Sequence, residues 1–289
     1  MKKQIEDSLS KLNFKKKREL RFKNICSNFE NEMLAPLICS SKIKTHLFKS
    51  LSDTVNSYFI ASKKHNFLNK TPNGLLVPKK EVEEHYNKIT IAYRDVLLSL
   101  NFNKIISRWT IPVVRYKEAL INKENATRSM RSELPHSDTW IGWDTNSILI
   151  NIPILGDTDR NRVNFLESPD DIDETWIEKQ VSFETGAKKF ASKCKVLKSH
   201  YKKGYIYVAD ISVLHQTYRE NECEGRVSMD IALYIDEPSK DDFGYNDTLS
   251  YEEIISIGSE NKLTFPLKMK EIIGISGVTR SNKFSFSKI

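Results

Sequence analysis

The chain has 289 residues, of which 39% are hydrophobic and 29% are charged, enough for one large domain or for a core domain with extensions. The net charge is +7, yet no basic stripe interleaved with aromatic residues and no helix-turn-helix or zinc-finger pattern accompanies it. These features exclude the familiar nucleic-acid-binding modules, and a lysine-rich solvated surface accounts for the charge.

The N-terminal segment carries Lys2 and Lys3, but no apolar segment follows them, and no window of about 18 apolar residues occurs in the chain. The four cysteines show neither CxxC nor zinc-type spacing, so we expect reduced thiols. We therefore expect a cytoplasmic protein that binds no membrane.

The first part of the chain, residues 1–104, predicts a mainly helical region. The clearest helix begins at Pro78, because proline is tolerated in a first helical turn. Its apolar residues recur at intervals of three and four, as on one face of a helix: Val82, Tyr86, Ile89, Tyr93, Val96 and Leu100. Residues 4–34 and 50–64 are weaker helical candidates.

The pattern changes at Ile105, where short runs rich in β-branched and aromatic residues begin: IISRWTIPVVRY, TWIGW, SILINIPIL, YIYVADI and RVSMDIALYI. Many short strands in series, without alternating helices, predict a β-sandwich or barrel. We assign this core to residues 105–238 and expect a polar insertion at about 157–203, with a helix near Glu184–Cys194. Residues 239–289 form a C-terminal extension.

A candidate metal site begins at His136 and Asp138. On a strand these two side chains would project to the same face, one pleat apart. A third ligand, His215, follows the strand-like run YIYVADI. Two histidines and one carboxylate on one face of a metal form the facial triad of non-haem Fe(II) oxygenases, in which the other coordination positions stay open.

A candidate anion anchor follows eleven residues after His215, at Arg226. We expect a hairpin turn at Gly225 to bring this strand back beside the strand that ends at His215. Arg226 and Ser228 would then point into the same cavity, where a guanidinium and a hydroxyl suit the far carboxylate of a dicarboxylate.

With these motifs, the stretch from about Ile105 to Asp236 resembles the 2-oxoglutarate/Fe(II)-dependent dioxygenases. It is most similar to the phytanoyl-CoA-hydroxylase-related branch, and within it to the streptomycin-biosynthesis-type and sporadic carbohydrate-cluster oxygenases. The resemblance implies a mainly β fold with helices, a double-stranded β-helix (jelly-roll, cupin-like) core buttressed by the N-terminal helices. It also implies Fe(II) as the metal, with 2-oxoglutarate and O2 as co-substrates.

Three residues of this chain differ from the patterns of other branches of the family and argue against those branches. Halogenases of the family replace the carboxylate ligand with a small residue, whereas Asp138 is present here. Prolyl-hydroxylase-type enzymes anchor the co-substrate with lysine, where this chain has Arg226. The nucleic-acid demethylase branch carries a second arginine six residues later, where this chain has Ala232.

Further residues near these motifs are weaker candidates. Ser147 and Thr217 are candidate co-substrate contacts, and the candidate substrate contacts are Trp140, Trp143, Asn151 and Arg131. The alternative is that both tryptophans are core residues of the sheet and that the arginine is an ordinary surface or ion-paired residue.

The predicted function is hydroxylation of a small polar metabolite, anionic or sugar-like, such as a sugar, an aminocyclitol or a nucleotide-linked sugar. Desaturation, cyclisation or epimerisation with the same co-substrates stays open as an alternative. So does a non-catalytic β-sandwich module in which His136 and Asp138 hold a structural metal. The sequence makes no prediction of the oligomeric state.

Overall fold

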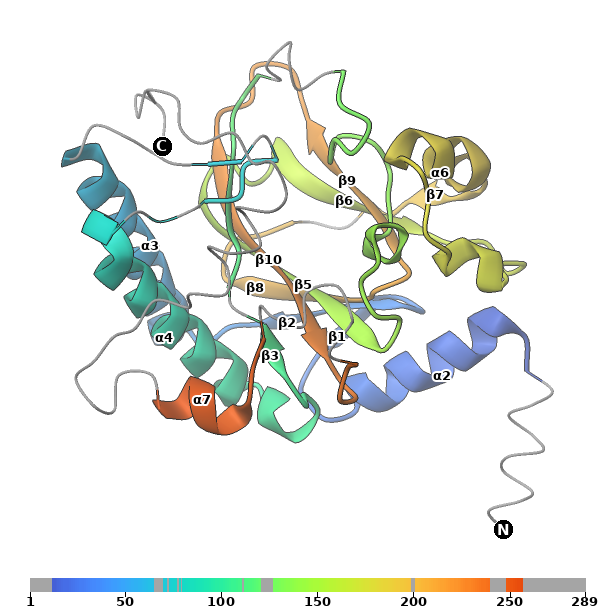
Figure 1. The fold of residues 1–289 in the computed structure, drawn as a ribbon, viewed down its shortest axis with the longest axis horizontal. Helices are drawn as coiled ribbons and strands as arrows, with labels where there is room; N and C mark the ends of the chain where they lie inside the picture. The colour runs from blue at the N-terminus through green and yellow to red at the C-terminus, as the bar shows by residue number, and fades with distance from the viewer. Residues whose placement is uncertain are drawn as a thin grey trace.

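The computed structural model describes residues 12–64, 70–71, 73–76, 78, 80–110, 112–120, 127–198, 201–239 and 248–256. Two antiparallel β-sheets lie at the centre of the molecule, with helices on one side and at the periphery (Figure 1). Most of the C-terminal extension expected at 239–289 lies outside the described residues.

The larger sheet has six strands in the order β1-β2-β8-β5-β10-β4, and the smaller has three in the order β7-β6-β9. The bounds of the six are β1 Glu32–Ala35, β2 Ile38–Lys42, β4 Val114–Lys117, β5 Ser147–Gly156, β8 Tyr205–Asp210 and β10 Arg226–Tyr234. Those of the three are β6 Asn161–Glu167, β7 Lys195–Val196 and β9 Leu214–Arg219. A further pair joins β3 (Trp109–Thr110) to β11 (Thr248–Leu249).

The pairing order defines a double-stranded β-helix. The segment at His136 forms an antiparallel bridge with His215 of β9, on the side opposite β6, and so stands as a further strand position of the small sheet. From β4 onward there are eight strand positions in chain order: β4, the His136 segment, β5, β6, β7, β8, β9 and β10. The first, third, sixth and eighth of these (β4, β5, β8 and β10) belong to the large sheet, and the other four belong to the small sheet. This is the jelly-roll arrangement, and the predicted fold class is confirmed.

Two strand assignments differ from the sequence-based expectations. The strand β10 pairs with β4 and β5 in the large sheet, whereas β9 pairs with β6 in the small one, so the expected hairpin beside His215 is wrong. The connection after β9 instead crosses from one sheet to the other. The segment 157–203, expected as an insertion, contains β6, which is a central strand.

The N-terminal region contributes both helices and strands. Helix α3 (Thr45–Lys64) and helix α4 (Glu83–Ser99), which follows the short 3₁₀ turn η1 (Lys80–Val82), pack against the large sheet (Figure 1). Five residues of the predicted α4 stripe have no exposed surface: Val82, Tyr86, Ile89, Tyr93 and Val96. The β1–β2 hairpin, which the sequence did not reveal, extends the large sheet through pairing of β2 with β8.

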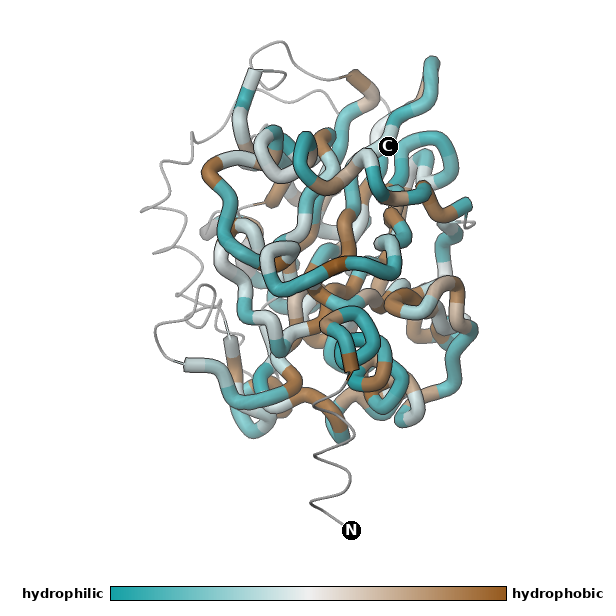
Figure 2. The backbone as a smooth tube through the Cα atoms, turned by 90° about the vertical axis from the view of Figure 1, so that its right-hand side faces the viewer, coloured by the Kyte–Doolittle hydropathy of each residue, from teal (hydrophilic) through white to brown (hydrophobic). Residues whose placement is uncertain are grey.

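The remaining helices lie around the sheets. Helix α6 (Phe183–Phe190) lies beside the small sheet, whereas helix α2 (Phe14–Cys26) lies near β1 and β2 of the large sheet (Figure 1). The other elements are α7 (Tyr251–Ser256), η2 (Phe102–Lys104), η3 (Asp138–Ile141), η4 (Glu174–Ile177) and η5 (Ala191–Lys193). On the side shown in Figure 2, hydrophilic segments form much of the outer loops, while hydrophobic segments concentrate further inside. Among the described residues, no helix has both the length and the apolar character that a membrane span requires.

Candidate metal and dicarboxylate site

The first two ligand candidates lie where an extended segment turns into a short helix. Asp138 is the first residue of η3, and Ser137 caps this helix by accepting a hydrogen bond from Thr139 N at 3.3 Å. Gly142 ends the helix at a φ of 102°, a conformation that glycine adopts without strain. The expected placement of His136 and Asp138 one pleat apart on a strand is therefore wrong, although both reach the same site.

The third ligand candidate comes from β9. His136 and His215 exchange two backbone hydrogen bonds, of 3.0 and 2.9 Å, which bring the two imidazoles side by side with ring centroids 4.3 Å apart. Asp138 Oδ1 lies 3.9 Å from His215 Nε2. One ligand atom from each of His136, Asp138 and His215 lies within 4.8 Å of the others, so the three can hold one metal ion.

Both imidazoles are oriented through their Nδ1 atoms. His136 Nδ1 lies 2.7 Å from Leu134 O, and His215 Nδ1 lies 3.3 Å from Val213 O. A carbonyl accepts from an N–H, so each Nδ1 carries the proton and each Nε2 offers its lone pair to a metal. Burial, and then the neighbouring His215, lower the pKa of His136 well below its ordinary value, which favours the neutral form that a ligand requires.

Helix α6 contributes an aromatic wall to this site. The ring of Phe183, the first residue of α6, stacks on His136 at a centroid distance of 4.2 Å and an interplanar angle of 16°. Phe183 is buried, and its backbone N–H donates to Ser129 O at 3.1 Å. The β6–β7 connection therefore covers one face of a metal-ligand candidate.

Arg226 is a buried cation with unused hydrogen-bonding capacity. Its exposed fraction is 1%, and Nη1 donates to the hydroxyl of Tyr201 at 3.1 Å. Its Nε and Nη2 atoms are buried and have no hydrogen-bond partner within the part of the chain that the structure describes. Because leaving charged donors unsatisfied in an interior is costly, this arrangement is typical of a site that binds an anion.

The strand around Arg226 presents a polar face to the space between the sheets. Alternate residues of neighbouring strands share this face by register, and they are Arg226, Ser228 and Asp230 of β10, Arg115 and Lys117 of β4, and Asn151 of β5. Asp230 accepts hydrogen bonds from Arg115, Asn151 and Ser228. Tyr201 donates to Asn151 Oδ1 while it accepts from Arg226. A jelly-roll interior filled by packing alone would be apolar here.

Contacts across the interior connect this polar face with the metal-ligand candidates. Lys117 of the large sheet donates to Ser132 Oγ, and Thr217 of β9 donates to the same oxygen at 3.3 Å. Thr217 is two residues from His215 on the same strand, so both side chains lie on one face. The two parts of the site therefore open to a common interior.

Lys117 was not anticipated from the sequence. It is 4% exposed and lies directly opposite Arg226 in the register of β4 and β10. Burial, and then the charge of Arg115, lower its pKa well below the ordinary lysine value. The carboxylate of Glu133 lies 3.8 Å from the Lys117 ammonium and acts in the opposite direction, favouring the charged lysine. An anion bound nearby would favour the charged form of Lys117 further.

The secondary candidates are not all brought to the site. Ser147 is buried at the end of β5 opposite the Arg226 end, on the order of 30 Å away along the strand, and its hydroxyl donates to Asp144 O. Trp140 is 1% exposed, and its indole N–H donates to Trp176 O at 2.8 Å, so it is a core residue and not an accessible platform.

Three other candidates have defined surroundings. Trp143 is half-buried, and its ring lies 6.1 Å from that of Tyr234, at the end of β10 away from Arg226. Asn151 belongs to the polar face already described and is fully engaged with Asp230 and Tyr201. Arg131 is half-buried on the segment before His136, and its Nη1 donates to Arg128 O at 3.3 Å.

Comparisons with known proteins give remote similarities in structure. The sequence matches no protein-family model and no curated protein. Among solved structures, the non-haem α-ketoglutarate-dependent carbocyclase SnoK from nogalamycin biosynthesis shares 9% identity, with 81% of this chain and 90% of that chain covered and a TM-score of 0.44. AviO1 from Streptomyces viridochromogenes Tue57 shares 10% identity, with 75% and 96% covered and a TM-score of 0.39.

A third structure, an N-substituted L-amino acid dioxygenase from Burkholderia ambifaria AMMD, shares 12% identity, with 71% of this chain and 84% of that chain covered and a TM-score of 0.35. At such identities and scores, the residues of the site itself are the basis for any functional conclusion.

Proposed function

We propose that this chain is a non-haem Fe(II)- and 2-oxoglutarate-dependent oxygenase. The observation that carries the proposal is the buried guanidinium of Arg226, whose Nε and Nη2 have no partner among the described residues, in the same interior as three metal-ligand candidates. Two imidazoles and one carboxylate suit Fe(II), and a guanidinium paired with an ammonium suits a dicarboxylate. A protein that bound only a structural metal would have no ligand to pair with the buried guanidinium of Arg226.

The roles of the residues follow from their positions. His136, Asp138 and His215 would hold the metal, which together with 2-oxoglutarate and O2 supplies the oxidative chemistry when bound. Arg226 would bind the far carboxylate of 2-oxoglutarate in bidentate fashion, and Lys117 would add a second positive charge beside it. Thr217 and Ser228 offer hydroxyl groups on the same interior faces.

Exclusion of bulk water is the other contribution of the chain. His136 is 5% exposed, and the ring of Phe183 covers one face of its imidazole. A site so enclosed strengthens the ionic contacts that orient an anion and protects reactive species from solvent.

We further propose that the substrate is a small polar metabolite, such as a sugar, an aminocyclitol or a nucleotide-linked sugar, and that the outcome is hydroxylation. The support is the sequence resemblance to carbohydrate-cluster oxygenases. Trp143 and Arg131, both half-buried, are proposed as substrate contacts. Desaturation, cyclisation and epimerisation are the alternative outcomes.

The decisive experiment measures succinate formed from 2-oxoglutarate by the Fe(II)-loaded protein, across a panel of nucleotide sugars, aminocyclitols and amino acids. We expect one Fe(II) per chain and 2-oxoglutarate binding that requires Arg226. His215→Ala should abolish metal binding and turnover, whereas His46→Ala, at an exposed position of α3, should behave as wild type. Equal metal binding by His215→Ala and wild type would end the oxygenase proposal.

A further inference from the structure

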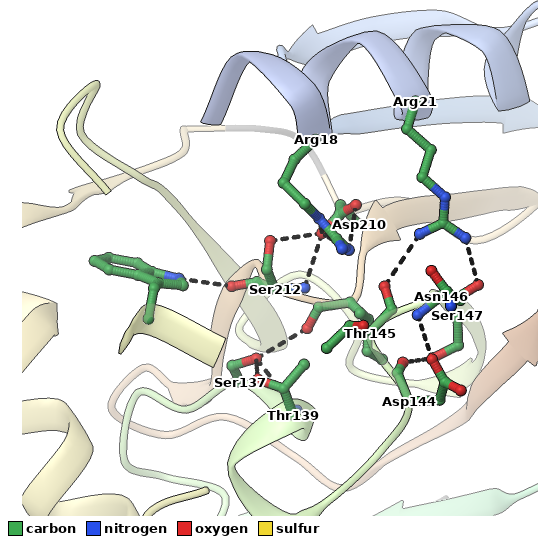
Figure 3. Close-up of polar contacts among 12 residues, drawn as sticks. Arg18, Arg21, Ser137, Thr139, Asp144, Thr145, Asn146, Ser147, Asp210 and Ser212 are labelled. Atoms are coloured by element: carbon green, nitrogen blue, oxygen red, sulfur yellow. Dashed lines mark hydrogen bonds and ion pairs between the residues drawn. The ribbon is translucent and has the colours of Figure 1, made fainter. Parts of the chain in front are cut away.

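A buried ion pair joins α2 to the turn between β8 and β9, and this turn leads directly to the ligand candidate His215. Arg18 of α2 donates three hydrogen bonds to the carboxylate of Asp210, at 2.7, 2.8 and 3.1 Å. The side chains are 9% and 1% exposed, so this is a buried, bidentate ion pair. Figure 3 shows Arg18 reaching from the helix to Asp210.

Asp210 organises the turn that leads to His215. It is the last residue of β8, and its Oδ1 accepts hydrogen bonds from Ser212 N at 3.0 Å and Ser212 Oγ at 2.5 Å. Val213 N also donates to Asp210 O at 2.9 Å. The chain is therefore fixed from Asp210 up to the residue before β9, whose second residue is His215.

Three consecutive carbonyl groups of this turn then hold parts of the metal site. Ile211 O accepts from Ser137 Oγ at 2.9 Å, and Ser137 lies between the ligand candidates His136 and Asp138. Val213 O lies 3.3 Å from Nδ1 of His215 and orients that imidazole.

The third carbonyl group, that of Ser212, connects the turn to two buried tryptophans. Ser212 O accepts from the indole N–H of Trp176 at 2.9 Å, and Trp176 O in turn accepts from the indole of Trp140 at 2.8 Å. Trp140 belongs to η3, the helix that Asp138 begins. The turn is therefore joined to the ligand-bearing segment at two points, directly at Ser137 and through Trp176 at Trp140. Figure 3 shows the contact at Ser137.

We infer that Arg18 is a positioning residue for the metal centre, acting through Asp210 on the 210–213 turn. The ion pair fixes the turn, the carbonyl groups of the turn set Ser137 and the His215 imidazole, and the three ligands meet in consequence. This inference rests on the proposed metal site, but it assigns to α2 a role that the triad itself does not require. Partners outside the ligand set commonly change metal affinity by ~10-fold to ~100-fold.

A matched control lies on the same helix. Lys15 is also buried, and its ammonium donates to Ser168 O and Asp170 Oδ1, both at 2.8 Å. This contact anchors α2 to Ser168 and Asp170 at the start of the β6–β7 connection; these residues carry no ligand candidate, and Phe183, which stacks on His136, lies later in that connection. Lys15→Met therefore tests whether any loosening of α2 is enough to disturb the metal.

The experiment is equilibrium dialysis of the full chain against Co(II), at a temperature where each variant is folded, combined with thermal unfolding of the metal-free protein. We expect Arg18→Met to weaken Co(II) binding by ~10-fold or more. Arg18→Lys should fall between Arg18→Met and wild type, and Lys15→Met should retain wild-type affinity. If Arg18→Met does not fold, Arg18→Lys carries the same comparison.

A double variant separates positioning from general stability. Arg18→Met with Asp210→Asn removes the whole ion pair and keeps an acceptor for Ser212, so it should bind Co(II) no more weakly than Arg18→Met alone. Lower unfolding midpoints with unchanged Co(II) affinity in the Arg18 variants would overturn the inference, as would equal losses of affinity in Lys15→Met. Failure of the wild-type chain to bind Co(II) would instead remove the proposed metal site itself.

Discussion

Replacing Arg226 with methionine should separate ligand binding from stability. The guanidinium has two buried donors, Nε and Nη2, with no hydrogen-bond partner among the described residues. A hydrogen bond to a charged group contributes ~1.5–3 kcal/mol, so two bonds to a carboxylate give ~3–6 kcal/mol, or roughly 10²-fold to 10⁴-fold in Kd. We expect Arg226→Met to weaken 2-oxoglutarate binding by that factor.

The same substitution should leave the ligand-free fold intact. Methionine removes a buried cation that lies opposite Lys117, together with two unsatisfied donors, each costing ~1–3 kcal/mol. The hydroxyl of Tyr201 keeps its bond to Asn151. The unfolding midpoint of ligand-free Arg226→Met should therefore equal or exceed that of wild type.

Calorimetric titration of 2-oxoglutarate into Mn(II)-loaded protein measures the first effect, and thermal unfolding of the free protein measures the second. Arg162→Met is the control, because Arg162 pairs with Glu220 at a partly exposed position. A strongly destabilised Arg226→Met that still binds 2-oxoglutarate with wild-type affinity would show that the arginine is structural, and the reasoning would be refuted.

Three further predictions follow from particular contacts. Tyr201→Phe removes the hydroxyl that accepts from Arg226 and should weaken 2-oxoglutarate binding by ~5-fold to ~10-fold, with Mn(II) affinity unchanged in the same titration. The fold lowers the pKa of His136 from the ordinary value of 6.5, so below pH 6.5 the unfolded chain binds a proton at this histidine that the folded chain does not. The stability of the metal-free protein should therefore fall as the pH drops below 6.5, by at most ~1.4 kcal/mol per pH unit. Thermal unfolding measured against pH should show a smaller slope in His136→Gln than in wild type. Gly186→Ala places a methyl group 2.4 Å from the Trp140 ring and should lower the free energy of unfolding by ~1–3 kcal/mol in urea titrations, whereas Ala187→Gly on the same helix should not perturb that ring.

The clustering of His136, Asp138 and His215, and Arg226 as a candidate anion anchor, could be predicted because local spacing and a family resemblance marked them. The backbone around Asp138 could not, since His-Ser-Asp fits both an extended pair and a Ser-capped helix start, and the cap at Ser137 decides between them. The residues brought together are thus more predictable from this motif than the conformation that brings them together.

Residues that act through strand pairing were missed for a different reason. Lys117 faces Arg226 only because β4 and β10 are neighbours in a specific register, and their residues are 109 positions apart in the sequence. The V-R-Y-K and R-V-S-M-D runs do alternate polar with apolar residues, which was the available signal. The expected hairpin after β9 failed because the same alternation suits either sheet of a jelly-roll.

The stacking of Phe183 on His136 shows that one wall of the candidate metal site comes from a connection outside the paired strands. The connection between β6 and β7 spans residues 168–194, and it can change in length and composition while the barrel keeps its register. Sequence changes in this connection can therefore alter access to the candidate metal site and leave its three ligand candidates unchanged. In the proposed oxygenase, substrate selectivity and metal chemistry would therefore be encoded on separate segments of the chain.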